Sequence, residues 1–169
     1  GAFVAPTTPE HRNLAQMVNM VLLMVMPKTF EWASLQINYN TISEPHRDYN
    51  NHGSSLIFLL GDFIDGEFQM TDGSLSVAER GAIYLFQGQA EHCSRPFTGE
   101  RISVTAFQHR TADTLSLDDR GNLAGMGFGS DLLPGCTTKS KHIHNTAPVA
   151  SKEESPPKRH GTCCGRGDE

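Results

Sequence analysis

The chain has 169 residues, which allows one domain with a real hydrophobic core and leaves little room for a second. Its 14 basic and 19 acidic side chains give a net charge of −5, and two basic residues first stand side by side at Lys158 and Arg159. This balance excludes a broad electrostatic grip on nucleic acid, but it permits recognition of a single flipped base. The longest apolar run, Met20 to Met26, is far shorter than the roughly 20 residues of a membrane span, so no membrane partner is expected.

The four cysteines stand at positions 93, 136, 163 and 164, without the spacing of a disulfide framework. We interpret them as free thiols, which favours a reducing, intracellular compartment. No basic, then apolar, leader pattern opens the sequence, and no signal peptide is predicted.

The first predicted element is a helix within residues 1–33, a segment expected to pack on the core. Thr8, Pro9 and Glu10 predict its start, with a capping hydroxyl, a proline at the first helical position and an acid near the positive end of the dipole. Pro27 predicts its end. One apolar stripe follows helical spacing: Leu14, Met17, Val18, Val21, Leu22 and Val25.

Residues 34–110 contain short runs rich in β-branched and aromatic residues, and they are expected to form the core domain. The predicted strands are 34–41, 54–60, 67–70, 74–77, 82–87 and 101–108. Turn signals separate nearly all of them, including Gly61-Asp62 and Thr98-Gly99. This interval predicts a compact barrel or sandwich. Residues 111–134 receive no assignment, and 135–169 are predicted to be disordered because little in them can be buried.

Three side chains of metal-ligand type stand out. His46 and Asp48 occupy positions i and i+2, which point to the same face of an extended backbone. His92 follows the apolar run 82–87. Two imidazoles and one carboxylate are the set that suits Fe(II) and leaves coordination positions open, so these three are the predicted metal ligands and catalytic residues.

Other potential ligands lie nearby in the sequence. His52 precedes Gly53 and is expected in a turn, and His109 ends the last predicted strand. Cys93 should point away from the face that His92 uses if that segment is extended. None of the three is included in the predicted metal site.

A predicted anion site follows the distal histidine. Arg101 comes nine residues after His92, and Ser103 shares its face in the strand 101–108. The planar guanidinium can hold a carboxylate through two hydrogen bonds, and the serine hydroxyl adds a donor. A dicarboxylate held there at its far end could reach the metal with its near end.

The order His46-x-Asp48, His92, Arg101-x-Ser103 resembles the Fe(II)- and 2-oxoglutarate-dependent dioxygenase superfamily over residues 34–108. The nine-residue step from histidine to arginine is similar to its prolyl-hydroxylase branch. This resemblance implies a mainly β fold with an N-terminal helix, a double-stranded β-helix of the jelly-roll or cupin-like barrel type. It also implies an oxidoreductase that uses Fe(II), 2-oxoglutarate as cosubstrate and O2.

The resemblance also assigns residue roles. Arg101 and Ser103 would bind the distal carboxylate of 2-oxoglutarate, and Asn38 and Tyr39 lie where relatives often carry a residue that contacts the cosubstrate. Asp65-Gly66 takes the place of the family's Gly-Gly turn, with aspartate in the first position.

Several alternatives stay open at this stage. The stretch 37–58 is also similar to the TET/JBP-type DNA-base oxygenases, although those relatives place more residues between histidine and arginine. The chain could instead be a catalytically silent β-helix that serves as a binding module, or a cupin-type metalloenzyme that does not use 2-oxoglutarate. The substrate of a dioxygenase could be a nucleic-acid base, a protein side chain or a small molecule, and the sequence does not indicate an oligomeric state.

Overall fold

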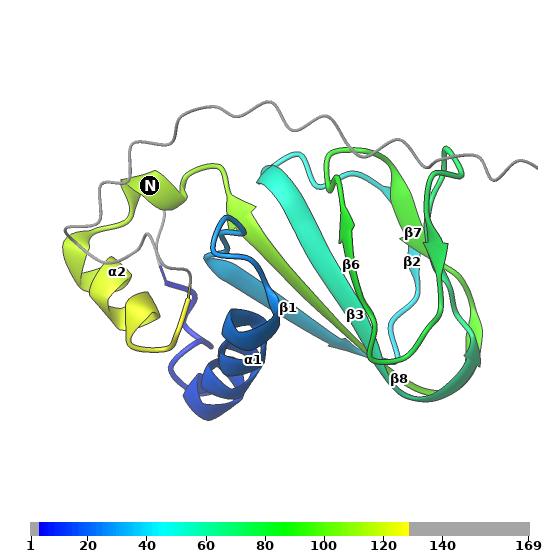
Figure 1. The fold of residues 1–169 in the computed structure, drawn as a ribbon, viewed down its shortest axis with the longest axis horizontal. Coiled ribbons are helices and arrows are strands. Elements are labelled where there is room, and N and C mark those ends of the chain that lie inside the picture. The colour runs from blue at the N-terminus through cyan, green and yellow to red at the C-terminus, as the bar shows by residue number, and fades with distance from the viewer. Residues whose placement is uncertain (1–3, 129–169) are drawn as a thin grey trace, which may run out of the picture. The chain divides into compact units, whose positions relative to one another are not determined.

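The structure is a computed structural model that describes residues 4–128 (Figure 1). The predicted disordered segment, 135–169, lies outside the described residues, as do the last residues of the unassigned stretch 111–134.

Within the described residues, eight strands form two four-stranded antiparallel sheets, and the strands alternate between the sheets along the chain except for one adjacent pair, β4 and β5. The order β1-β8-β3-β6 in one sheet and β2-β7-β4-β5 in the other is that of a double-stranded β-helix, the jelly roll (Figure 1). The predicted fold class is therefore confirmed. In the first sheet the strands are β1 Ser34–Tyr39, β8 Phe97–His109, β3 Asn51–Asp65 and β6 Ile83–Phe86. In the second they are β2 Ser43–His46, β7 His92–Ser94, β4 Phe68–Met70 and β5 Ser76–Val77.

Two dipeptides that predict turns, each with one glycine, instead lie inside the long paired strands β3 and β8. Gly61 and Gly99 have φ angles of 108° and 102°, which favour glycine. A Cβ atom at Gly61 would lie 2.2 Å from the Glu100 carbonyl oxygen, and one at Gly99 would lie 2.3 Å from the Asp62 carbonyl oxygen. The prediction of turns was wrong here because these glycines permit a close backbone approach within the ladder, without ending the strands.

Two strands were not predicted from the sequence, β2 and β7. They have four and three residues, and β2 contains Pro45, which normally argues against a strand. They pair with each other, with Ser43 opposite Ser94 and His46 opposite His92. This pairing brings two of the predicted metal ligands onto neighbouring strands.

The first helix, α1 (Arg12–Val25), covers the first sheet but begins later than predicted. Its N-cap is His11, which makes no side-chain capping bond, so the prediction of a Thr8 cap was wrong. The helix ends before Met26, which is extended, as expected for a residue that precedes proline. The buried face is Ala15, Val18, Asn19 and Leu22.

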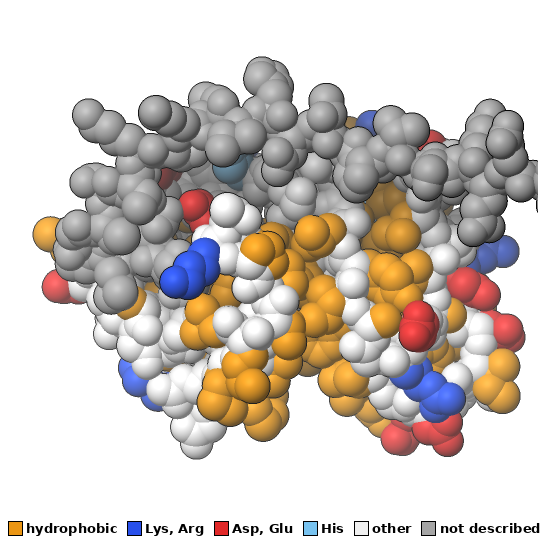
Figure 2. Space-filling view, viewed as in Figure 1, with side chains coloured by type: hydrophobic (Ala, Val, Ile, Leu, Met, Phe, Trp, Pro, Cys, Tyr) orange, Lys and Arg blue, Asp and Glu red, His pale blue; other side chains and the backbone are white. Residues whose placement is uncertain are grey.

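Buried Asn19 explains why the predicted apolar stripe of α1 was misplaced by part of a turn. Its side-chain amide donates to the Met126 carbonyl oxygen at 2.8 Å, and its carbonyl oxygen accepts from the Trp32 indole at 2.8 Å. The buried face is thus centred on a polar residue, and apolar side chains are left outside. Figure 2 shows hydrophobic side chains gathered on the surface over α1. They include Met17, Met20, Leu23, Met24 and Val25, which are between 54% and 78% exposed.

The residues after β8 form a 3-10 turn, η1 (Ala112–Thr114), and a second helix, α2 (Leu117–Ala124). Ser116 caps α2 by accepting from the Asp119 backbone N–H at 3.1 Å. Within residues 4–128 no helix is long and apolar enough to cross a bilayer.

Two hydrophobic clusters lie on opposite faces of the first sheet. One joins this sheet to the helices and includes Leu22, Trp32, Leu56 and Val104. The other fills the interior of the barrel. Its buried members are Ile57, Leu59, Phe63, Phe68, Met70 and Phe86. The candidate site lies in this interior, where aromatic side chains surround its polar groups.

Candidate metal centre

Three side chains from β2, the following loop and β7 converge at one end of the barrel: His46, Asp48 and His92. Their ligand atoms all lie within 4.8 Å of one another. Asp48 Oδ1 is 3.9 Å from His46 Nε2, and Asp48 Oδ2 is 3.7 Å from His92 Nε2. Two atoms bound to one ion at about 2.1 Å each lie no more than about 4.2 Å apart. The two Asp48 distances fit within this span, and the 4.8 Å limit of the whole cluster lies about 0.6 Å beyond it, so the cluster is close to the dimensions of a site for a single metal ion.

Each of the two histidine rings is oriented by a contact between its Nδ1 atom and a backbone carbonyl oxygen. His46 Nδ1 lies 2.8 Å from the Glu44 carbonyl oxygen, and His92 Nδ1 lies 2.9 Å from the Ala90 carbonyl oxygen. A carbonyl only accepts, so Nδ1 carries the proton in both rings. Nε2 then offers its lone pair to the centre of the cluster, which is the tautomer that a metal requires.

The two histidines differ in their surroundings. His92 is 3% exposed and packs against Phe68 and Phe86, with ring centroids 5.4 Å and 5.1 Å away. The side chain of His46 is 45% exposed and lies at the surface. One ligand is therefore fixed by the core, whereas the other faces the opening of the site.

Arg101 is the most deeply buried charged side chain of the described residues, with 1% exposure. Its guanidinium lies 5.9 Å and 5.5 Å from the ring centroids of Phe63 and Phe97, within the range of cation–π attraction. It donates to the Thr41 carbonyl oxygen at 3.2 Å and to Ser94 Oγ at 3.4 Å. Burial lowers the pKa of Arg101 from its ordinary value, because the charged form loses its hydration.

The hydrogen-bonding capacity of Arg101 is incompletely used. Within residues 4–128 no carboxylate forms an ion pair with it, and its Nε has no hydrogen-bond partner. A buried cation without a counter-charge is costly. The guanidinium is thus a candidate position for an anion.

Ser103 and Asn38 lie together beside this position. Ser103 is 7% exposed and shares the face of Arg101 on β8. The Asn38 side-chain amide donates to Ser103 Oγ at 3.4 Å, so the serine hydroxyl can still donate its own hydrogen. The structure therefore brings these two predicted cosubstrate residues to the same place.

Tyr39 lies apart from the other predicted cosubstrate residues. Its hydroxyl lies 2.9 Å from Glu100 Oε1, and its side chain is 60% exposed. Glu100 precedes Arg101 on β8 and points to the other face of the strand. Because Tyr39 follows Asn38 on β1, it shares this outer face and does not reach the anion position.

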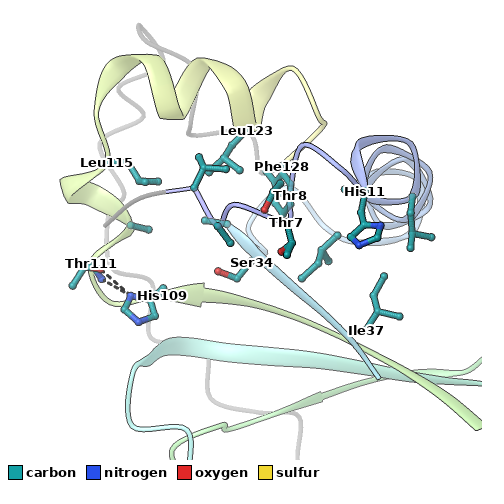
Figure 3. Close-up of a pocket in the computed structure, with 17 residues that line it drawn as sticks. Thr7, Thr8, His11, Ser34, Ile37, His109, Thr111, Leu115, Leu123 and Phe128 are labelled. Atoms are coloured by element: carbon teal, nitrogen blue, oxygen red, sulfur yellow. Dashed lines mark hydrogen bonds between the residues drawn. The ribbon is translucent and has the colours of Figure 1, made fainter. Parts of the chain in front are cut away.

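His52, His109 and a large cavity lie away from the cluster. His52 is exposed, and Cys93 is not part of the cluster. His109 bonds Thr111 and lines a cavity of about 630 Å³ (Figure 3). That cavity is bounded by the N-terminal segment, α1, β1 and α2, on the helix-covered face of the first sheet.

Several residues that shape the site were not predicted. Thr41 and Ser94 accept from Arg101, and Asn51 contacts Asp48. Ser94 could have been found, because it stands at i+2 from His92 and shares its face on an extended strand. The others depend on loops whose conformation the sequence pattern does not indicate.

No protein-family model matches the chain, and no curated protein sequence matches it. Among solved structures, the chain is similar to an RmlC-like cupin protein from Desulfovibrio desulfuricans. The two are 24% identical, with a TM-score of 0.34, over 47% of this chain and 76% of that one. The fold assignment therefore stands on the strand order of this chain.

Proposed function

We propose that this chain is an Fe(II)- and 2-oxoglutarate-dependent dioxygenase, which couples the oxidative decarboxylation of 2-oxoglutarate to the oxidation of a second substrate. The observation that carries the proposal is the buried, unpaired guanidinium of Arg101 in the same barrel interior as His92. Its burial without a counter-charge is accounted for if an anionic ligand completes the site.

The spacing between the two ends of the site permits a five-carbon dicarboxylate. Ser94, which accepts from Arg101, follows His92 by two residues on β7. Two residues of a strand span roughly 6.6 Å. Four carbon–carbon bonds of about 1.5 Å give an extended chain of roughly 5 Å. A ligand with one carboxylate at Arg101 therefore has the length to place its other end near the metal ligands.

The donor set fits Fe(II). Two imidazoles and one carboxylate are the facial set of non-haem iron oxygenases, and they leave room for a chelating cosubstrate and O2. Bound iron would supply the oxygen chemistry, and the protein would supply position and electrostatics.

Each group of the chain has a defined task in this proposal. The backbone carbonyls of Glu44 and Ala90 keep the histidines in the tautomer that presents Nε2. Arg101 holds the distal carboxylate by a charge-assisted hydrogen bond, and Ser103 adds a donor. Phe63 and Phe97 exclude water from the guanidinium and so strengthen that interaction.

A cupin-type metalloprotein that does not use 2-oxoglutarate is the second candidate, because it would share the jelly roll and the metal ligands. Arg101 separates the two functions. Only the dioxygenase needs a carboxylate at that position.

The test is an anaerobic titration of the apo protein with Fe(II) and then 2-oxoglutarate, followed by the visible metal-to-cosubstrate absorbance band. The wild-type protein should give the band. Arg101→Met should retain Fe(II) but bind 2-oxoglutarate at least about a hundredfold more weakly, because loss of one partner of a buried ion pair costs roughly 3–5 kcal/mol. Glu100→Gln is the matched control, since this neighbouring charge lies on the outer face of β8 and should leave the band unchanged.

The alternative outcomes are distinct. A wild-type protein that binds Fe(II) but gives no band with 2-oxoglutarate, and behaves like Arg101→Met, indicates the cupin-type metalloprotein. A folded wild-type protein that binds no metal indicates a silent binding module.

A further inference from the structure

Asp48 differs from the two histidines of the metal cluster, because a side chain donates a hydrogen bond to its ligand group. The Asn51 side-chain amide donates to Asp48 Oδ2 at 3.3 Å, and the Asn51 backbone N–H donates to the Asp48 carbonyl oxygen at 3.0 Å. Asn51 is 4% exposed and is the first residue of β3. A buried amide thus touches the only carboxylate of the cluster.

The Asn51 amide is itself held in place. Its N–H group also donates to Ser55 Oγ at 3.1 Å, and Ser55 is fully buried. The Gln89 side chain donates to the Asn51 backbone carbonyl oxygen at 2.7 Å. The register of β3 against β8 shifts between His52 and Leu56, and this irregular stretch contains Ser55 and begins just after Asn51.

The loop after β6 closes over this amide without room for a side chain. A Cβ atom at Gly88 would lie 2.9 Å from both Asn51 Nδ2 and Ser55 Oγ. The Gly88 carbonyl oxygen accepts from the Asp48 backbone N–H at 2.8 Å. Gly88 therefore fixes the backbone of Asp48 and leaves the space that the Asn51 amide occupies.

We propose that Asn51 is the positioning residue of the metal centre, which sets the orientation of the Asp48 carboxylate for the ion. A carboxylate only accepts hydrogen bonds, so the amide must present its N–H group, and Ser55 holds it in that orientation. Partners of this kind orient metal ligands and affect affinity strongly. The proposal rests on the metal-binding part of the proposed function and is independent of 2-oxoglutarate.

The test measures Co(II) binding to the full apo chain by its visible absorption bands, together with the melting temperature of each apo protein. Asn51→Ala should weaken Co(II) binding by roughly 10–100-fold and change the shape of the bands, because the carboxylate is no longer oriented. Ser54→Ala is the matched control. It removes a neighbouring hydroxyl on the same strand, whose hydrogen bond is with the Gln87 side chain, so its Co(II) affinity should stay close to that of the wild type.

Each result supports or overturns the proposal. Wild-type affinity and bands in Asn51→Ala overturn it, and so does an equal loss in Ser54→Ala, which would indicate general structural support. If Asn51→Ala does not fold, Gly88→Ala takes its place as the test. Its added methyl group displaces the amide without removing it, so it should weaken Co(II) binding to the same extent as expected for Asn51→Ala. Wild-type affinity in Gly88→Ala then overturns the proposal. A wild-type protein without Co(II) bands removes the metal site itself, and with it the proposed function.

Discussion

The two ends of the candidate site are built in opposite ways. The metal end stands on β2, β7 and the loop after β2, on strands of four and three residues, and His46 is exposed there. The arginine end stands on β8, a strand of 13 residues that pairs with both β1 and β3, and Arg101 is fully buried. The metal end is therefore mixed, because His46 is exposed and held by a local hydrogen bond whereas His92 is buried in the core, and the arginine end is wholly part of the core.

Because of this contrast, substitutions at the two ends should differ in their effects on ligand binding and on the stability of the fold. At the metal end, ligand geometry depends on contacts such as the Nδ1 bonds of the histidines, and exchange of an exposed ligand should disturb little else. At the arginine end, position is set by the paired backbone of two long strands, so a change of geometry there should also affect folding.

The largest expected effect compares the two histidines. His92→Ala and His46→Ala should each reduce Fe(II) affinity by orders of magnitude, because each removes one of three ligands. Only His92→Ala should also lower the free energy of unfolding of the apo protein, by about 2–4 kcal/mol, because it leaves a cavity against Phe68 and Phe86. His46→Ala should stay within about 0.5 kcal/mol of the wild type. Denaturant unfolding measures the free energy of unfolding of both apo variants. Equal losses would contradict the difference between the buried and the exposed histidine.

A somewhat smaller effect is expected for the backbone of the arginine end. Gly61 pairs with Arg101, and a Cβ atom at Gly61 would collide with the Glu100 carbonyl oxygen. Gly61→Ala should lower the free energy of unfolding by about 3 kcal/mol, and it should weaken 2-oxoglutarate binding because the strand that carries Arg101 must shift. Gly73→Ala is the control. It has a φ of 78° but no atom within 4 Å of the added methyl, so only the strain of about 1 kcal/mol remains.

For Gly61→Ala, thermal or denaturant melts and a 2-oxoglutarate titration provide the measurements. If it and Gly73→Ala lost the same stability, the close approach of β3 and β8 would not be a constraint.

The sequence was informative about the fold wherever strands carry apolar residues. β3, β6 and β8 were predicted from their β-branched and aromatic residues, although the turn signals at Gly61 and Gly99 made the predicted β3 and β8 too short. β2 and β7 were not, because Pro45 and the polar residues around them carry no such pattern. Their strand conformation comes from pairing with each other, a long-range contact that local propensity does not contain.

The candidate site shows the same limit at the level of single residues. His46, Asp48, His92, Arg101 and Ser103 were found because their chemistry is unusual and their spacing follows the alternation of a strand. Asn38 and Tyr39 could not be distinguished, because neighbours on a strand point to opposite faces and the register against β8 was unknown. Asn51 was missed because its contact with Asp48 depends on the turn that connects them.

The smallest expected effect tests whether the two faces of β8 have separate roles at the arginine end. Ser103→Ala should weaken 2-oxoglutarate binding by roughly 1 kcal/mol, the net value of one hydrogen bond, because Arg101 remains in place. Tyr39→Phe removes a hydroxyl that bonds Glu100 on the outer face of β8, so 2-oxoglutarate affinity should not change. Calorimetric titration of 2-oxoglutarate into the protein loaded with Mn(II) measures both without turnover. A loss in Tyr39→Phe as large as that in Ser103→Ala would mean that the outer face of β8 also contributes to the cosubstrate site, and the separation of its two faces would fail.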